Sequence, residues 1–326
     1  MQPSIQSPPV HRVRTPQRGK MSGYFLRRLI QLIPIIFGIY TITFFLTHVL
    51  PGDPALFLLG SHDDPQVLEN MRRVLRLDQP IGVQYVTFLQ QALVGDFGTS
   101  YITRRPVITM INEALWPTIV LALSAMFLAV VIGVPLGIIS AIHKNSIVDN
   151  VARLIALIAV SIPVFWLGIQ LQILFGVQLK MLPISGIGLD SHLILPAFAL
   201  CVGTLALLTR MTRSTLLEEL NRDYVRVARS KGLHERVVIW RHALRNALIP
   251  IMTVGGGSLA SLLSGSLLVE VIFNWPGLGY LLERSIQTRD YSVLQGLIVV
   301  LALIYAGLNL IIDFTYPLID PRIRYR

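Results

Sequence analysis

Six long runs of apolar residues divide this chain of 326 residues and set what it can fold into. Each run is long enough to cross a hydrocarbon core about 30 Å thick, which takes roughly 20 residues of helix. They lie at about 29–49, 115–141, 152–176, 193–212, 247–272 and 294–316. Charged residues make up 14% of the chain, against about 25% in soluble domains. The sequence therefore predicts an all-α integral membrane protein with six transmembrane helices.

The first apolar run follows Arg27 and Arg28, as the core of a secretory signal would. It is longer than the usual signal core of about 7–15 residues, and no small-x-small cleavage site follows it. We therefore expect the run to remain as the first transmembrane helix.

Lys and Arg residues are distributed unevenly between the two sides that six helices would create. With the N-terminus in the cytoplasm, 20 of the 28 fall in cytoplasmic segments. Retained loops are enriched in Lys and Arg, so we expect both termini to be cytoplasmic in a multi-pass protein of the cell (inner) membrane. The net charge of +10 then requires no nucleic-acid partner.

The segments between and around these runs suggest five parts. Residues 1–22 lack an apolar period and predict a disordered cytoplasmic tail, within which Met21 is a second possible start. The extracytoplasmic segment shows helical periodicity in its middle and predicts a small accessory subdomain. The expected parts are the tail 1–22, the first helix 23–49, the extracytoplasmic segment 50–113, the core 114–317 and the cytoplasmic tail 318–326.

Groups that could support catalysis or ion coupling are sparse. There is no GxxxxGK[ST] phosphate loop, so the chain cannot be its own ATPase. The seven histidines and the single Cys201 show no metal-ligand spacing, and Cys201 is expected to be a small buried hydrophobe. We therefore expect no enzyme activity, no metal site and no cofactor bound by this chain.

Polar groups are also rare within the apolar runs. Glu270 and Asp313 lie near predicted helix ends, where they could line a translocation path or merely cap a helix. Gly257, Ser261 and Gly265 recur every four residues, a small-residue stripe that lets another helix approach closely. That helix could belong to this chain or to a partner subunit.

The segment from Arg213 to Asn246 is the one long charged insertion in the second half of the chain. Its apolar residues fall at helical spacing before and after Gly232, which predicts two amphipathic helices joined at that glycine. We interpret the segment as a cytoplasmic hairpin that receives force from another protein. The alternative is a hairpin that rests on lipid headgroups.

Two stretches of this hairpin carry a resemblance to a known family. Asp223-Tyr224-Val225-Arg226-Val227-Ala228-Arg229-Ser230-Lys231-Gly232 and Arg241-His242-Ala243-Leu244-Arg245-Asn246 resemble the E-A-A loop of permease subunits in ATP-binding-cassette importers, and most closely the dipeptide, oligopeptide, glutathione and nickel branch. The general pattern has Glu-Ala-Ala ahead of the glycine, whereas Arg226-Val227-Ala228 stands here. That substitution looks typical of the peptide branch.

Further motifs of the same branch follow in order from about residue 24 to the end. They are Pro51-Gly52-Asp53-Pro54-Ala55, Leu77-Asp78-Gln79-Pro80, Gly95-Asp96-Phe97-Gly98 with Ser100, Arg105-Pro106-Val107, Phe273-Asn274-Trp275-Pro276-Gly277-Leu278-Gly279, Arg289-Asp290-Tyr291 and Asp320-Pro321-Arg322. The number and order of these matches identify the chain as similar to the first permease of a pair.

This resemblance implies a type I importer permease core and a set of partners. They are a second related permease, two subunits that bind ATP and Mg²⁺, and an extracytoplasmic substrate-binding protein. It implies an ATPase-coupling loop made of Asp223, Tyr224, Val225, Arg226, Ala228, Arg229, Gly232, His242 and Asn246. Tyr224, Val225, Ala228 and Arg229 are expected to offer contacts to the ATPase.

The resemblance leaves the substrate open among dipeptides or oligopeptides, which we expect first, glutathione and nickel. A different class, the ion-coupled secondary transporter, is disfavoured because the helix centres carry no ionisable relay. A scaffold protein is the other alternative, and it would leave uptake unchanged on deletion.

Overall fold

The computed structural model describes residues 30, 31, 33–45, 65–74 and 78–319. The predicted tail 1–22, the motif at 51–55, Leu77 and the motif at 320–322 lie outside these residues.

From residue 65 onward, the described helices are α3 (Pro65–Val74), α4 (Ile81–Leu93), α5 (Val107–Ile142), α6 (Ile147–Ser161), α7 (Val164–Leu171), η1 (Gln172–Gln178), α8 (Ser191–Leu220), α9 (Asp223–Ser230), α10 (Glu235–Val237), η2 (Val238–Ala243), α11 (Leu244–Ile272), α12 (Leu278–Gln287) and α13 (Tyr291–Ile319).

The described residues are helical, apart from loops and one isolated bridge between Thr99 and Pro106. Four helices are long and apolar enough to cross a membrane: α5, α8, the continuous stretch Glu235–Ile272, and Tyr291–Ile312 within α13. A fifth span is formed if the bent pair of α6 with α7 and η1 counts as one. Within the described part of the first run, the helix Ile33–Phe45 is shorter. The all-α membrane class is confirmed, whereas these residues establish only four or five of the six spans.

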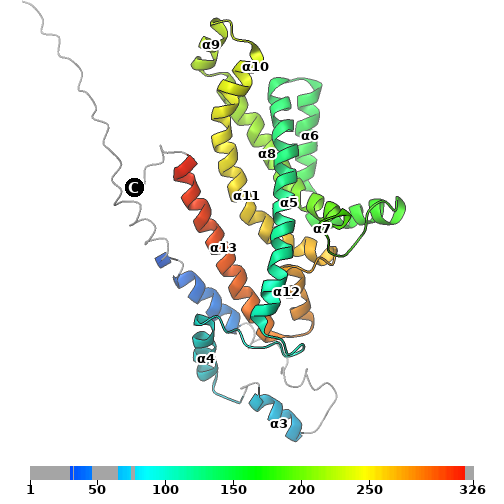
Figure 1. Cartoon of the computed structure of the whole chain (residues 1–326), viewed down its shortest axis with the longest axis vertical. Helices are drawn as coiled ribbons and strands as arrows, with labels where there is room; N and C mark the ends of the chain where they lie inside the picture. The colour runs from blue at the N-terminus through cyan, green and yellow to red at the C-terminus, as the bar shows by residue number, and fades with distance from the viewer. Residues whose placement is uncertain (1–29, 32, 46–64, 75–77, 320–326) are drawn as a thin grey trace, which may run out of the picture.

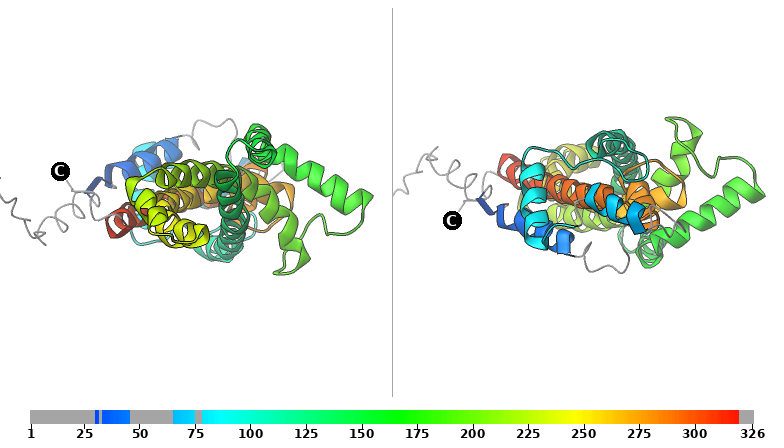
Figure 2. Two further views of the ribbon diagram at one scale, coloured as in Figure 1. Left: turned by 90° about the horizontal axis from the view of Figure 1, so that it is seen from above. Right: turned by 90° about the horizontal axis from the view of Figure 1, so that it is seen from below.

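The prediction of one helix over 152–176 is wrong. The chain breaks between α6 and α7, and the two helices meet at 102°. Pro163 explains the break because its ring disfavours helical backbone at the residue before it, and Ile162 is extended, with φ −83° and ψ 124°. Figure 1 shows α7 leaving the bundle sideways, and both views of Figure 2 confirm it.

Helix α8 lies at the centre of the bundle and packs along α5, α6 and α11. Two glycines of α5 allow the closest approach. A Cβ atom on Gly133 would come within 2.8 Å of the Leu205 carbonyl oxygen, and one on Gly137 within 2.6 Å of the Thr209 carbonyl oxygen. Cys201 is fully buried in this core, as expected of a small hydrophobe.

Helix α4 packs on the first helix through aromatic side chains. The rings of Tyr40 and Phe88 stack with centroids 4.4 Å apart, and the hydroxyls of Thr41 and Tyr85 are hydrogen-bonded at 2.8 Å. These contacts hold the accessory segment at one end of the bundle, while α9 and α10 lie at the other end beside the α5–α6 turn (Figure 1). The segments predicted to be external and cytoplasmic are therefore at opposite ends.

Candidate functional site

The 213–246 hairpin begins on the last turns of α8 and ends on the first turn of α11. The prediction of one helix before the glycine is only partly right, because α8 ends at Leu220 and a separate helix, α9, starts at Asp223. Arg222 at the N-cap is extended, with φ −70° and ψ 150°, which ends the helical path. Asp223 in the first turn of α9 places a negative charge at the positive end of the helix dipole.

Gly232 ends α9 in the way predicted for the glycine of the hairpin. Its φ is +77°, in the left-handed region that glycine adopts without strain. The Leu233 N–H donates to the Ala228 carbonyl (3.4 Å), and the Gly232 N–H donates to the Arg229 carbonyl (2.9 Å). This pair of bonds is the Schellman motif, which satisfies carbonyls left free at a helix end. The turn therefore has one defined geometry.

An ion pair links the two arms across this turn. The Arg229 guanidinium donates to the Glu235 carboxylate at 2.6 and 3.1 Å. This contact raises the pKa of Arg229. Both side chains are about half exposed, so the pair adds about 0–1 kcal/mol and mainly fixes orientation.

The inner face of α9 belongs to the core of the hairpin. Val225 and Ala228 are buried, in the same cluster as Val238, Ala243 and Leu244. The expectation that Val225 and Ala228 offer contacts to another protein is therefore wrong, because this chain already covers them. Helical spacing alone could not tell which of two apolar faces turns inward.

The outer surface of the hairpin still carries apolar side chains. Tyr224, Val227, Leu233, Val237 and Trp240 are all exposed, Trp240 by 59%. Several large exposed apolar side chains within one short segment are typical of an interaction surface. The hairpin is therefore unlike a purely solvated loop.

Tyr224 has a second role as a hydrogen-bond centre. Its hydroxyl donates to the Glu219 carboxylate on α8 and accepts from the Asn246 amide on α11 (3.0 Å). Burial, followed by the hydrogen bond to Glu219, raises the pKa of the phenol. The structure thus brings together two predicted loop residues, Tyr224 and Asn246, and ties both arms to α9.

Three other predicted loop residues are accessible. Asp223 and Arg226 are strongly exposed and form a loose ion pair at 3.8 Å. His242 in η2 is half-buried. None of the three has a contact that holds the hairpin closed.

A buried ion pair anchors the hairpin to the neighbouring turn, and sequence reasoning missed it. The Arg213 guanidinium donates to the fully buried Asp149 carboxylate at 2.6 and 2.8 Å. Ser140 and the Asn145 N–H complete the shell at 2.6 and 2.9 Å. The available signal was Ser146-x-x-Asp149, an N-cap pattern whose serine indeed accepts from the Asp149 N–H. Nothing in it identified Arg213.

Glu270 lies at the other end of α11 and is fully buried in this chain. Its carboxylate accepts from the Gly279 N–H at 2.6 Å. Nearby, the Trp275 indole donates to the Pro117 carbonyl (2.9 Å), and the Leu278 N–H donates to the Thr118 hydroxyl (2.8 Å). The 273–279 motif therefore joins α5, α11 and α12 tightly.

Three motifs far apart in sequence meet at the same end. Asp290 accepts from the Ser100 hydroxyl (2.5 Å) and from the Tyr101 N–H (3.2 Å). A Cβ atom on Gly296 would come within 3 Å of Phe97 and Val107. The 95–107 segment is thus fixed on the start of α13.

The remaining predicted positions differ in what surrounds them. Gly265 faces Leu200 of α8, with 3.5 Å to a built Cβ, whereas Ser261 is exposed. Contacts within this chain therefore cover only part of the stripe. Asp313 lies on α13, and its side chain is outside the described residues.

Comparison with known proteins gives consistent matches over most of the chain. Residues 133–325 match the family described as binding-protein-dependent transport system inner membrane component, and residues 21–122 match the N-terminal family of such membrane components. The glutathione transport system permease protein GsiC of Escherichia coli (strain K12) is 41% identical, over 94% of this chain and 100% of the relative. The dipeptide transport system permease protein DppB of Alkalihalophilus pseudofirmus is 40% identical with the same coverage.

Solved structures support the fold. The inward-facing MetNI methionine ABC transporter, in its native crystal form, superposes with a TM-score of 0.53 at 20% identity, over 65% of this chain and 97% of that chain. At this identity the likeness supports the arrangement of helices alone.

Proposed function

Because this chain belongs to the family of inner membrane components of binding-protein-dependent transport systems, we propose that it carries dipeptides or oligopeptides across the membrane. It is a multi-pass permease subunit of an ABC importer of the peptide and glutathione family. The subunit is not catalytic, and partner subunits hydrolyse the ATP that drives import. The proposal concerns the substrate and the way in which the energy reaches this chain.

The observation that carries the coupling proposal is the construction of the 213–246 hairpin. Its first arm begins on the last turns of α8, and its second arm continues as an unbroken helix into α11. Asp149, Tyr224 and the Schellman turn hold it as one piece. A rigid hairpin with exposed apolar side chains can transmit the movement of a docked ATPase to the helices that it joins.

The partner set follows from the family. We propose that a second permease, two ATP-binding subunits and an extracytoplasmic binding protein complete the importer. The hairpin end is then cytoplasmic, together with both termini, in agreement with the distribution of Lys and Arg. The segments 95–107 and 273–291 lie at the opposite end, where the binding protein would deliver substrate.

The transport path is proposed along the face of α11 that this chain leaves open. Ser261 and Leu268, which are seven residues apart and so share one face of the helix, are exposed there. Glu270 and Asp313 stay proposed path residues, and Glu270 would need a conformational change to reach the path because it is enclosed in this conformation.

Glutathione is the second candidate substrate, supported by relatives named as glutathione permeases at 41% identity. Both candidates share a peptide backbone, so the permease needs no large change to accept either. Selection among them is expected to rest mainly on the binding protein.

The proposal is tested by reconstituting the complete importer with its binding protein in vesicles. We expect ATP-dependent uptake of labelled dipeptides, with no uptake when a proton or sodium gradient replaces ATP. Uptake of glutathione but not of dipeptides would reassign the substrate. Gradient-driven uptake without ATP would overturn the proposal itself.

A further inference from the structure

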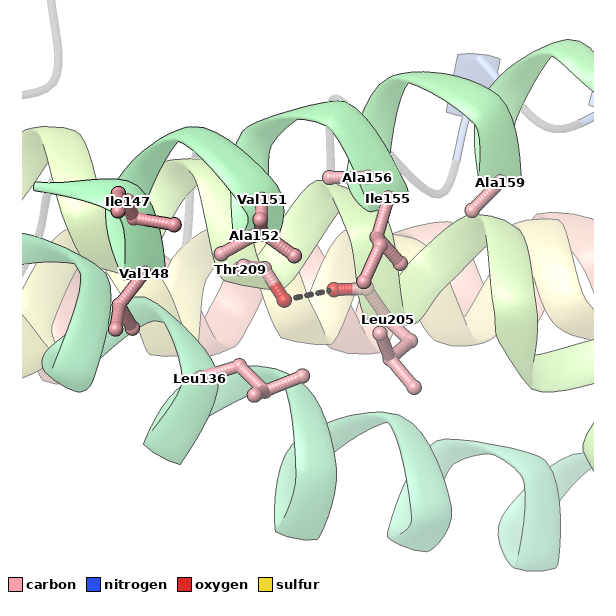
Figure 3. A pocket seen from close by; sticks show the side chains of 10 residues that line it. All are labelled: Leu136, Ile147, Val148, Val151, Ala152, Ile155, Ala156, Ala159, Leu205 and Thr209. Atoms are coloured by element: carbon pink, nitrogen blue, oxygen red, sulfur yellow. Dashed lines mark hydrogen bonds between the residues drawn. The ribbon is translucent and has the colours of Figure 1, made fainter.

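An apolar groove of about 320 Å³ lies between α5, α6 and α8 (Figure 3). Most of its lining comes from one face of α6. The lining residues are Leu136, Ile147, Val148, Val151, Ala152, Ile155, Ala156, Ala159, Leu205 and Thr209.

The groove follows α6 for the depth of one leaflet. Its lining on α6 runs from Ile147 to Ala159, which spans about 18 Å at a rise of roughly 1.5 Å per residue. Half of a hydrocarbon core about 30 Å thick is about 15 Å. The groove therefore starts near the hairpin end of the bundle and reaches about as deep as one acyl chain.

The lining offers no polar group to a ligand. Its one hydroxyl, on Thr209, already donates to the Leu205 carbonyl (2.8 Å) and the Gly133 carbonyl (3.1 Å). Figure 3 shows the hydroxyl turned along α8 toward Leu205. An occupant must accordingly be a hydrocarbon along its whole length.

The open side of the groove is exposed in this chain. Ile147 is 82% exposed, and Val148, Val151 and Ile155 are each about half exposed. The groove is narrow and about 18 Å long, with aliphatic side chains along its length, dimensions that suit a single acyl chain.

Positive charge lies at the end of the groove next to the hairpin. The turn before Ile147 carries His143 and Lys144, both exposed. The charge of Arg213, nearby on α8, is matched by Asp149. Arg153 on α6 is half exposed and lies 3.7 Å from the same carboxylate, so Lys144 and Arg153 are the cations placed to attract an anionic headgroup at the surface.

We propose that this groove binds one acyl chain of an anionic phospholipid from the leaflet on the hairpin side, with the phosphate beside Lys144. A tail gains no hydrophobic free energy by moving from bilayer to groove, because lipid tails are as apolar as leucine. Retention depends instead on close packing and on headgroup charge. The groove should consequently prefer anionic over zwitterionic lipid.

The test uses the complete importer in vesicles of phosphatidylethanolamine and phosphatidylglycerol. A phosphatidylglycerol with a diazirine in one chain is photolysed, and labelled positions on α6 are identified. We expect label on the groove side chains Val151 and Ile155 in excess over the outward-facing Leu154 and Leu157. Zwitterionic probe should label the groove less, and Lys144→Gln should reduce that difference.

Two variants that place phenylalanine either in the groove or on the outward face of α6 separate the groove from general lipid contact. Ala152→Phe fills the groove and should lower labelling of Ile155 to the level of Leu154, whereas Leu157→Phe adds bulk on the outward face and should leave it unchanged. Unchanged labelling of Ile155 in correctly assembled Ala152→Phe, or equal labelling of both faces in the wild-type protein, overturns the proposal. So does labelling of the isolated chain that disappears in the complete importer, because a partner subunit would then cover the groove. If Ala152→Phe does not fold, the labelling of the groove residues relative to the outward residues of α6 in the wild-type protein still tests whether the groove binds lipid.

Discussion

The Arg213 guanidinium and the Asp149 carboxylate form two hydrogen bonds, at 2.6 and 2.8 Å, across 64 residues of sequence. Arg213 is the first residue of the 213–246 hairpin, and Asp149 is in the first turn of α6. The pair therefore fixes the base of the hairpin to a neighbouring turn at the same end of the bundle. Asp149 has no exposed surface, and its other cation, Arg153, is half exposed and 3.7 Å away, so the carboxylate depends mainly on Arg213.

Removing the guanidinium should be strongly destabilising. Arg213→Met leaves the buried carboxylate with only the half-exposed Arg153, 3.7 Å away, as a charge partner. Breaking a buried pair costs about 3–5 kcal/mol, and we expect a loss toward the lower end of that range. Arg213→Met combined with Asp149→Asn should recover much of that loss, because the amide can still bond to Ser140. The measurement is thermal unfolding of the purified subunit in detergent.

Arg222→Met is the control for this experiment. Arg222 pairs with Glu218 at 2.6 Å, but both side chains are more than half exposed. Surface ion pairs contribute about 0–1 kcal/mol to the free energy of unfolding, so the midpoint of thermal unfolding should hardly change. Equal effects of Arg213→Met and Arg222→Met would show that burial of Asp149 is unimportant.

The outward apolar residues of the hairpin should decide docking. Val227→Asp introduces a charge at a position that is 51% exposed, so folding should be unaffected while the ATP-binding subunits no longer co-purify. Val83→Asp, on α4 at the opposite end, is the matched control at 48% exposure. If the ATPases still co-purify with correctly folded Val227→Asp, this part of the hairpin does not bind them.

Substitutions of Gly232 test how much the left-handed turn contributes to stability and to ATP-driven uptake. A Cβ atom there would meet nothing within 4 Å, so any effect comes from φ +77° alone. Gly232→Val should cost about 1–3 kcal/mol and lower ATP-driven uptake, while Gly232→Asn should retain most of it because asparagine tolerates this backbone region.

Gly82→Val in α4 provides the comparison, since that glycine also has open space around it but no positive φ. It should leave uptake unchanged. If Gly232→Val transports as well as Gly232→Asn, the left-handed turn is not needed for coupling.

Glu270 should act mainly by holding α11 and α12 together through its hydrogen bond to the Gly279 N–H. Glu270→Ala deprives the Gly279 N–H of its acceptor, and leaving such a group unsatisfied costs about 1–3 kcal/mol. Glu270→Gln keeps an oxygen for this bond and should be nearly as stable as the wild-type protein. The two are compared by thermal unfolding and by uptake. If Glu270→Gln folds normally yet abolishes uptake, the carboxylate has a role in transport beyond holding the turn.

Much of this protein follows from its sequence. Hydropathy predicted a membrane protein because a run of about 20 apolar residues matches the thickness of the hydrocarbon core. Local backbone rules predicted that a helix of the hairpin ends at Gly232. The motifs indicated the family, and the matches over residues 21–122 and 133–325 confirm it.

Only the tertiary structure decided which residues meet. Helical spacing placed Val225, Val227 and Ala228 on a helix, but the packing of α9 on η2 buried the first and third and left Val227 exposed. Pro163 indicated a kink in the sequence, but the full break of 102° between α6 and α7 was not predicted because apolar composition continues through it. Asp149 with Arg213, and Ser100 with Asp290, pair across long separations. Hydropathy and periodicity report on neighbours along the chain, whereas such pairs depend on how whole helices pack, so only the folded bundle could reveal them.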